Sequence, residues 1–449
     1  MKLGILGTGK IVQEFLPWLV EHTPFTVQAV CSTPRSAAKA AELCAQYQIP
    51  QHTTNYFELL QWVDAVYIAV PNLQHARYAR VALEAGKHVI VEKPMAVTAA
   101  ETEELAALAQ RKRLFLFEAM TTQYQPNYAK LRELLPRVGT VRMVQCSFSQ
   151  YSSRYDAFCA GQTPPVFDPL CAGGALMDLG VYNVSYIVGL FGEPNKAVYA
   201  ANMERNIDTS GVLMMDYSGF KAVSLAAKDC AAPARCIIQG TKGYILQKST
   251  PNYCGGVTFH PNEGKEEHCN LNGDRPRQAA EFEAFYRAMT AGDQELCARM
   301  LDTSIAVSRV LTVARRSAGI RFPGDGQRSK HARALVRLRP GIAQPIQPFQ
   351  QGKQPFARAV WRQRGERMGG ALIEQLQRGH AMRGGVQRMV RRLAKQAGIR
   401  RLHALQGRNP FGARLRFAHK RADGIQQVGR VRATVFVGRA VAFVRAIFI

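Results

Sequence analysis

The first 120 residues alternate short apolar segments with segments whose apolar residues recur at helical spacing. Strands are expected at residues 2–6, 25–30, 65–70, 88–91 and 114–117, with helices at 10–21, 36–47, 75–85 and 99–110. Strands that alternate with helices of this length predict right-handed β-α-β units and a parallel sheet. This part of the chain is therefore expected to be a doubly wound α/β domain.

After about residue 140 the pattern changes. A long helix is expected at residues 174–190. It is followed by five alternating strands at 196–202, 209–217, 221–228, 234–240 and 244–248, and then by two amphipathic helices at 277–289 and 294–317. Strands with interleaved apolar and polar faces are typical of antiparallel sheets. The second half is therefore predicted to be an α+β domain.

The run Gly7-Thr8-Gly9-Lys10-Ile11-Val12 follows the first strand and opens the first helix. Glycines in this position let the backbone turn sharply and approach a pyrophosphate at the helix N-terminus. Val12 stands where the dinucleotide fingerprint has Gly or Ala. The context predicts dinucleotide binding by Gly7, Thr8, Gly9, Lys10 and Ile11, and a glycine turn without a ligand is the alternative.

The second strand ends in Cys31-Ser32-Thr33-Pro34-Arg35-Ser36, which contains no acidic residue. An NAD site would place Asp or Glu here to accept from the ribose 2′-hydroxyl. Hydroxyls and a guanidinium suit a 2′-phosphate instead, because Arg makes charge-assisted bonds to it. NADP is therefore favoured over NAD, with Ser32, Thr33 and Arg35 as ligands. The alternative is that Ser32 and Ser36 cap the next helix.

Several motifs occur together in one order along residues 1–325. They are Ala69-Val70-Pro71-Asn72 with His75, Ala85-Gly86-Lys87-His88-Val89, Glu92-Lys93-Pro94, the run from Gly173 to Tyr182, and Gly240-Thr241-Lys242-Gly243. This combination resembles the Gfo/Idh/MocA family (glucose–fructose oxidoreductase, inositol dehydrogenase, rhizopine catabolism). Glu118-Ala119-Met120, Asp178 and Tyr182 are similar to its dimeric dihydrodiol dehydrogenase and NADP-dependent D-xylose dehydrogenase branch. Thr121 and Gln123 depart from that branch, which leaves the substrate open.

The resemblance implies an NADP-binding Rossmann domain at residues 1–120 and a substrate and oligomerisation domain at 121–325. The second domain would be built on a large, mostly antiparallel open sheet, through which members usually form dimers or tetramers. Members oxidise or reduce a hydroxyl or carbonyl on a sugar, cyclitol or similar ring, so a sugar or diol substrate is expected. The resemblance extends the cofactor site to Ala69, Val70, Pro71, Asn72, His75, Glu92, Lys93 and Pro94.

Hydride transfer to or from a nicotinamide needs a matched proton transfer at the substrate oxygen. Tyr182 is the candidate general acid/base, Lys93 its electrostatic partner, and Asp178 the orienting group. Asp178 and Tyr182 are four residues apart, so on a helix they share one face. Without the resemblance, a solvated Lys and a packed Tyr would be the simpler reading. A non-catalytic NADP-binding sensor on the same fold is the alternative function.

The cysteine spacing and the hydrophobicity of the chain bear on metal binding, disulfide bonds, cellular location and membrane insertion. The ten cysteines show no C-x-x-C pair and no zinc spacing, so neither a metal site nor a disulfide framework is expected. Scattered thiols fit a reducing cytoplasm. No apolar run of about 18 residues occurs, which argues against a membrane span.

The segment after residue 325 has a different composition. From Arg328 onward it holds 27 of the 59 Lys and Arg residues against three of the 33 acids, and no Tyr or Cys. Such charge attracts polyanions, but no nucleic-acid recognition module appears. Residues 326–449 are therefore interpreted as a product of wrong-frame translation or read-through, or as a disordered tail; a functional tail or an extra domain is the alternative. An intact mass from the native host tests this, because a full-length product contradicts the wrong-frame interpretation.

Overall fold

The computed structural model describes residues 1–323, 325, 402–404, 414–420, 426–437 and 442–448. The chain forms two compact units, Met1–Pro340 and Gly341–Ile449. In the second unit, β15 (Leu402–Ala404), β16 (Arg414–Lys420), β17 (Gln426–Val437) and β18 (Ala442–Phe448) form one antiparallel sheet. The prediction that residues 326–449 are non-native or disordered falls mainly outside the described residues and stays a prediction.

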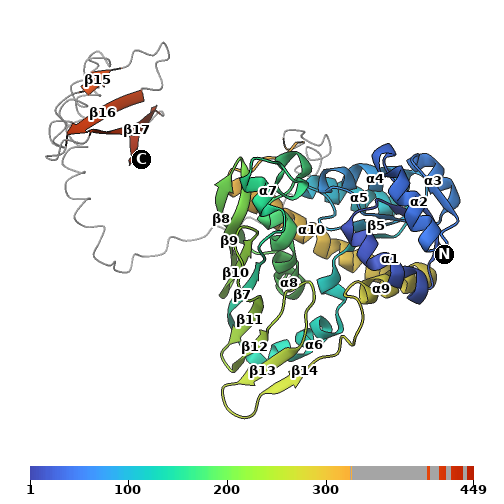
Figure 1. The fold of residues 1–449 in the computed structure, drawn as a ribbon. Coiled ribbons are helices and arrows are strands. Elements are labelled where there is room, and N and C mark those ends of the chain that lie inside the picture. Colours follow the sequence, from blue (N-terminus) through green and yellow to red (C-terminus); the bar gives the residue numbers. More distant parts are fainter. Residues whose placement is uncertain (324, 326–401, 405–413, 421–425, 438–441, 449) are drawn as a thin grey trace, which may run out of the picture. The chain divides into compact units, whose positions relative to one another are not determined.

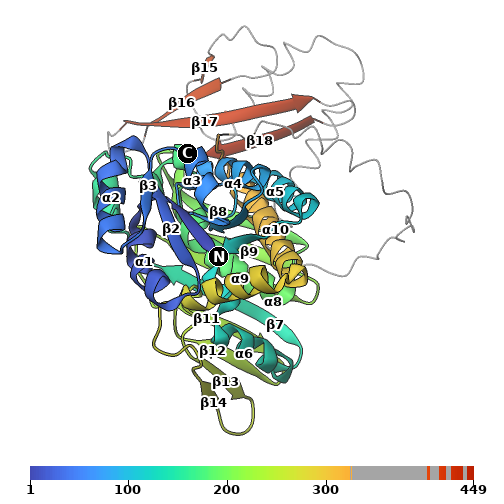
Figure 2. The same cartoon turned by 90° about the vertical axis from the view of Figure 1, so that its right-hand side faces the viewer.

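The first unit opens with a six-stranded parallel sheet in the order β3-β2-β1-β4-β5-β6. Figures 1 and 2 show the helices packed around it. The predicted Rossmann-type fold is confirmed, and β3 and α3 are additions that the sequence pattern missed. The elements are β1 (Lys2–Leu6), α1 (Lys10–His22), β2 (Thr26–Cys31), α2 (Ala37–Gln46), β3 (Gln51–Thr53), α3 (Tyr56–Trp62), β4 (Ala65–Ile68), α4 (His75–Glu84), β5 (His88–Glu92), α5 (Ala99–Lys112) and β6 (Leu116–Ala119).

The second sheet has eight strands in the order β14-β13-β12-β11-β7-β10-β9-β8. Only the neighbours β7 and β10 run parallel, so the predicted mostly antiparallel sheet is confirmed. Its strands are β7 (Val141–Ser149), β8 (Lys196–Glu204), β9 (Ile207–Tyr217), β10 (Phe220–Ala227), β11 (Arg235–Gly240), β12 (Gly243–Gln247), β13 (Val257–Pro261) and β14 (Glu267–Cys269). The helices after β6 are α6 (Pro126–Leu134), α7 (Tyr155–Cys159), α8 (Val181–Phe191), α9 (Ala279–Ala291) and α10 (Gln294–Ser317).

The helix expected at residues 174–190 begins as a π-helical turn, Leu176–Gly180, and continues as α8. The whole stretch Pro169–Phe191 is long and apolar enough to cross a membrane by length and composition. Of its most apolar window, 78% is buried inside the protein, as in a core helix. α8 packs against the face of the second sheet that also contacts α10.

Two hydrophobic cores support the fold, and the later helices are shared between them. Phe282 and Phe285 of α9 belong to the first core, where they pack against Phe15 and Phe117 with ring centroids 4.8 Å apart in each pair. The first half of α10 joins this core and its second half joins the other. The predicted boundary between residues 120 and 121 therefore does not separate the two cores, because α9 returns to cover the first sheet.

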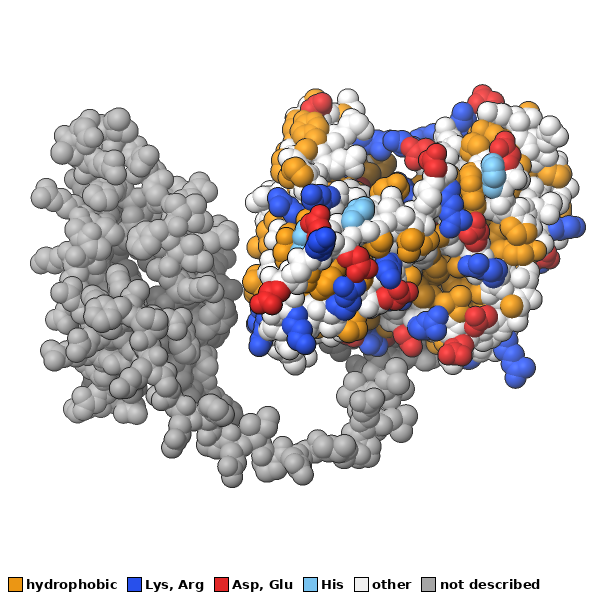
Figure 3. All heavy atoms as spheres, turned by 90° about the horizontal axis from the view of Figure 1, so that it is seen from below, with side chains coloured by type: hydrophobic (Ala, Val, Ile, Leu, Met, Phe, Trp, Pro, Cys, Tyr) orange, Lys and Arg blue, Asp and Glu red, His pale blue; other side chains and the backbone are white. Residues whose placement is uncertain are grey.

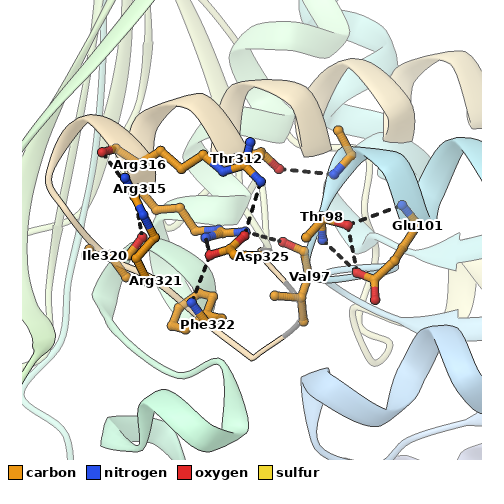
Figure 4. Close-up of polar contacts among 11 residues, drawn as sticks. Val97, Thr98, Glu101, Thr312, Arg315, Arg316, Ile320, Arg321, Phe322 and Asp325 are labelled. Carbon is orange, nitrogen blue, oxygen red and sulfur yellow. Dashed lines mark hydrogen bonds and ion pairs between the residues drawn. The ribbon is translucent and has the colours of Figure 1, made fainter. Parts of the chain in front are cut away.

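A buried ion pair anchors the segment that follows α10 (Figure 4). Arg315 of α10 is fully buried, and its two terminal nitrogens lie 2.5 and 2.6 Å from the carboxylate oxygens of Asp325. The same guanidinium donates to the carbonyl oxygen of Val97, 3.3 Å away, in the segment after β5. The Phe322 amide also donates to Asp325, at 2.9 Å. Asp325 thus fastens the chain after α10 to Arg315, which in turn contacts the segment that follows β5.

Charge on residues 1–327 is balanced. Residues 1–327 hold 32 basic and 30 acidic residues, and Figure 3 shows both signs interspersed on the face that it draws. A binding surface for polyanions needs clustered charge of one sign. That face therefore does not have the character of a nucleic-acid-binding surface.

Candidate active site

The glycine turn lies at the end of β1, where the chain enters α1. Gly7 has φ +123°, and a Cβ there would collide with the carbonyl oxygen of Ala69, so the turn requires glycine. A Cβ on Gly9 would meet no described atom within 4 Å, which leaves open space at the helix start. No side chain caps the N-terminus of α1. Free amides facing open space at a helix N-terminus fit a pyrophosphate.

The loop after β2 presents two of its three predicted ligands to solvent. Thr33 and Arg35 are exposed, and Arg35 forms no ion pair with any residue that the structure describes. Ser32 is buried and turns inward, because its amide donates to the Thr53 carbonyl and its hydroxyl to the Thr33 carbonyl. Thr33 and Arg35 are therefore the residues of this loop that can reach a 2′-phosphate.

The loop after β4 connects the two domains. The Asn72 side-chain amide donates to the Ala172 carbonyl at 3.0 Å, across 100 positions of sequence. His75 is buried, and its two ring nitrogens lie 2.7 Å from the Val70 carbonyl oxygen and 2.8 Å from the Pro94 carbonyl oxygen. The sequence predicts His75 as a cofactor-binding residue, with a packing role as the alternative; both of its ring nitrogens contact backbone carbonyls here, which fits the packing role.

Lys93 follows β5 at the carboxyl edge of the parallel sheet, where such sheets bind ligands. Its Nζ donates to the Asp178 carbonyl oxygen at 3.0 Å and to Asp178 Oδ1 at 3.2 Å. The same Nζ lies 4.7 Å from the ring centroid of Tyr182. The three predicted catalytic residues therefore come together, but Lys93 stands over the face of the Tyr182 ring and not at its hydroxyl.

Asp178 lies between two lysines. Its second carboxylate oxygen accepts from Lys228, a residue that directly follows β10 and whose side chain is only 6% exposed. Burial alone would raise the pKa of Asp178, but Lys93 and Lys228 hold that pKa well below its usual range. Asp178 is therefore a carboxylate at neutral pH, and it orients both ammonium groups.

The ionisation of the other two groups follows from their surroundings. Burial would lower the pKa of Lys93, but Tyr182, Asp178 and Glu92 together raise it. Burial raises the pKa of Tyr182, and Lys93 opposes that rise only in part. The Tyr182 hydroxyl, which hydrogen-bonds to no residue that the structure describes, is therefore protonated at neutral pH and available as a proton donor.

Glu92 and Pro94 flank Lys93 in different ways. The Tyr67 hydroxyl donates to Glu92 Oε1 at 2.6 Å, and burial raises the pKa of Glu92. Pro94 is buried, and its carbonyl contacts His75. Glu92 is therefore tied to the core of the first domain and serves to hold the strand end that positions Lys93.

A cleft of about 450 Å³ lies next to Phe148. The Phe148 and Tyr182 rings have centroids 6.1 Å apart, so Phe148 lies between the cleft and the candidate catalytic residues, none of which lines the cleft itself. It is lined by Phe148, Ser149, Gln150, Ala232, Ala234, Thr250, Asn252, Tyr253 and Arg277. Among the described residues, no group of three or more His, Cys, Asp or Glu could hold a metal ion.

Comparison with known proteins decides the family. Residues 1–120 match the family model described as "Oxidoreductase family, NAD-binding Rossmann fold", and residues 128–246 match the GFO/IDH/MocA C-terminal domain. The scyllo-inositol 2-dehydrogenase (NADP(+)) IolU of Bacillus subtilis is 34% identical over 329 residues, which cover 72% of this chain and 99% of the relative. The chain belongs to the Gfo/Idh/MocA oxidoreductase family.

Two further comparisons agree with this assignment. Human trans-1,2-dihydrobenzene-1,2-diol dehydrogenase is 27% identical over 340 residues, covering 72% of this chain and 99% of that protein. The crystal structure of the 3-ketoreductase KijD10 from Actinomadura kijaniata, with NADP and TDP-benzene, superimposes with a TM-score of 0.59 at 24% identity. It covers 70% of this chain and 98% of that structure, and it shows the shared fold.

Two residues of the candidate site in this Gfo/Idh/MocA oxidoreductase carry no motif in the sequence. The sequence pattern places Lys228 only at the end of a strand and Arg277 only at the start of a helix. Lys228 lies 50 positions from Asp178, so nothing local indicates the contact. A basic residue at the end of a buried strand was the one signal in the sequence for Lys228.

Proposed function

We propose that this oxidoreductase transfers a hydride between NADP and a ring carbon that carries a hydroxyl or carbonyl, on a cyclitol, vicinal diol or sugar. The observation that carries the proposal is the convergence of Lys93, Asp178 and Tyr182 at the carboxyl edge of the parallel sheet. The names of the relatives support the reaction class, since IolU acts on scyllo-inositol with NADP(+) and others on a dihydrodiol.

The preference for NADP is supported by the loop after β2. NADP, when bound, supplies or accepts the hydride at its nicotinamide ring. Gly7 and Gly9 would admit its pyrophosphate to the N-terminus of α1, and Thr33 and Arg35 would bind the 2′-phosphate. No acidic residue follows β2 to select the 2′-hydroxyl of NAD.

The chain's own residues supply the proton. In the reductive direction Tyr182 donates its hydroxyl proton to the carbonyl oxygen and becomes a phenolate beside the Lys93 ammonium, and in the oxidative direction that phenolate form accepts the proton of the alcohol. The Lys93 ammonium has three donors, of which Asp178 takes two, so one remains for the substrate oxygen. Lys228 keeps Asp178 ionised and in place, and Asp178 in turn fixes Lys93.

We also propose that the protein forms a dimer or tetramer through the outer face of its eight-stranded sheet. Large apolar side chains on this face are exposed, and Val198 and Met214 stand opposite each other on β8 and β9. An apolar face of this kind is typical of an interface between subunits.

The ten cysteines are all free thiols, which supports a cytoplasmic location.

The reaction is tested by NADP⁺ reduction with the full-length chain over scyllo-inositol, trans-dihydrodiols, neutral pyranoses, D-glucuronate and D-glucose 6-phosphate. Tyr182→Phe should lower kcat about 10²- to 10⁴-fold, the usual contribution of a general acid or base. Tyr186→Phe is the matched control, because its ring lies one turn further along α8 and its buried hydroxyl has no hydrogen-bond partner among the described residues. Turnover that survives in Tyr182→Phe, or a folded protein that binds NADPH and turns over none of these substrates, contradicts the proposal.

The assembly is tested by light scattering after size-exclusion chromatography. Met214→Glu should dissociate the oligomer, because it buries a charge in an apolar interface. Val313→Glu is the control, since Val313 is equally exposed (53%, against 51% for Met214) but lies on α10, away from the sheet face. A monomeric wild-type protein, or an oligomer that survives Met214→Glu, contradicts this assembly.

A further inference from the structure

The cleft next to Phe148 is lined by four separate segments. The end of β7 contributes Phe148, Ser149 and Gln150, the loop between β10 and β11 contributes two alanines, the loop after β12 contributes Asn252 and its neighbours, and Arg277 precedes α9. Phe148 packs against the Tyr182 ring, and the charge of Arg277 influences the ionisation of Tyr182, so the cleft adjoins the candidate catalytic groups. The cleft is therefore where the part of a substrate remote from the reacting carbon would lie.

Arg277 brings a guanidinium without a direct partner to this cleft. Its side chain forms no ion pair and donates no hydrogen bond to any residue in the described part of the chain. The residue is partly exposed, and its Nε is buried. Burial raises the pKa of Glu92 and of Glu281, and Arg277 lowers the pKa of both through its charge, but neither carboxylate contacts it directly. A bound oxyanion would supply the charge-assisted hydrogen bonds that this guanidinium lacks.

Asn252 presents the complementary polar group. It is 93% buried, since its exposed fraction is 7%, and its Oδ1 has no hydrogen-bond partner among the residues that the structure describes. A buried amide oxygen without a donor lacks a hydrogen bond that a ligand hydroxyl would supply. Arg277 and Asn252 together therefore suit a ligand that carries both an anionic group and hydroxyls.

We infer that the substrate is a hydroxylated ring that carries a carboxylate or phosphate, with this anion bound by Arg277 and a hydroxyl donating to Asn252. The inference rests on the proposed function, because it places the remote part of the same substrate. A guanidinium binds a carboxylate or a phosphate through two parallel hydrogen bonds, so the two anions are chemically equivalent as ligands of Arg277. Neutral cyclitols and sugars lack the group that Arg277 binds.

The test is calorimetric titration of the full-length protein with D-glucuronate, D-glucose 6-phosphate and D-glucose, both with saturating NADPH and without it. At least one charged probe should bind about 10- to 100-fold more tightly than glucose, which is the usual effect of a charge-assisted hydrogen bond. Arg277→Gln should abolish that preference, and Arg277→Lys should retain part of it. The preference should also weaken as ionic strength rises.

Arg275→Gln is the matched control. Arg275 lies two residues away on the same loop, is exposed, and is paired with Glu283 at 2.8 Å, so its loss should leave the preference unchanged. Equal affinity for charged and neutral probes, no binding of any probe, or a preference that survives Arg277→Gln overturns the inference. The proposed function fails by a different readout, which is the absence of NADPH binding or of any effect of Tyr182→Phe on turnover.

Discussion

Asp208 near the start of β9 should make the stability of this protein fall as pH rises from about 4 to about 6. Its carboxylate is 1% exposed and accepts from the Leu176 amide at 2.7 Å and the Tyr199 hydroxyl at 2.8 Å. Its other oxygen faces Gly174 and has no donor among the described residues. Burial raises the pKa of Asp208 from 3.8 to about 6, although these two donors and Lys228 oppose the rise.

The sign and size of the effect follow from linkage. Because the pKa is higher in the folded chain than in the unfolded chain, the folded state binds the proton more tightly between these two values. The stability that protonation contributes is fully present below pH 3.8 and is lost as pH rises through about 6. A rise of about two pKa units corresponds to about 3 kcal/mol at 1.36 kcal/mol per unit.

The measurement is urea unfolding of the wild-type protein and Asp208→Asn, followed by circular dichroism between pH 4 and pH 7.5. The variant cannot ionise, so the free energy of unfolding of the wild type relative to the variant should fall by about 2.5 kcal/mol as pH rises from 4 to 7.5, the remainder of the effect lying below pH 4. Asp216→Asn is the control, because Asp216 lies on the same strand but its side chain is partly exposed and pairs with Lys221. A difference between wild type and Asp208→Asn that stays constant with pH would refute the reasoning.

Three other substitutions test the fold and the site. Asp325→Asn should lower the free energy of unfolding by about 3–5 kcal/mol in a denaturant titration, because it leaves Arg315 buried without its carboxylate; a loss below 1 kcal/mol would contradict this. Gly7→Ala should weaken NADPH binding more than about 10-fold in a fluorescence titration, since its Cβ collides with the Ala69 carbonyl at a φ that disfavours side chains; unchanged affinity would show that the turn tolerates a side chain. Lys228→Gln should lower kcat by roughly 10- to 100-fold, because the Asp178 carboxylate loses a charge-assisted partner; an unchanged kcat would make Lys228 purely structural.

Much of the candidate site could be predicted because its motifs are local. The turn Gly7-Thr8-Gly9 could be recognised because a strand runs directly into a helix at this point. The E-K-P motif could be recognised from its place at the end of β5. Lys93, Asp178 and Tyr182 could be singled out only through their resemblance to a family. Lys228 and Arg277 escaped notice, because each acts through partners that are distant in the sequence.

Hydrophobic periodicity and turn residues by themselves determined the order of β-α units, the parallel first sheet and the mostly antiparallel second sheet, because both signals act between near neighbours in the chain. The tertiary structure alone decided that Asp178 lies between Lys93 and Lys228, which are 85 and 50 positions away from it. It also decided that α9 covers the first sheet although it follows the second. Contacts of this kind depend on the order of strands in a sheet and on which buried surfaces fit together, and no short stretch of sequence carries that information.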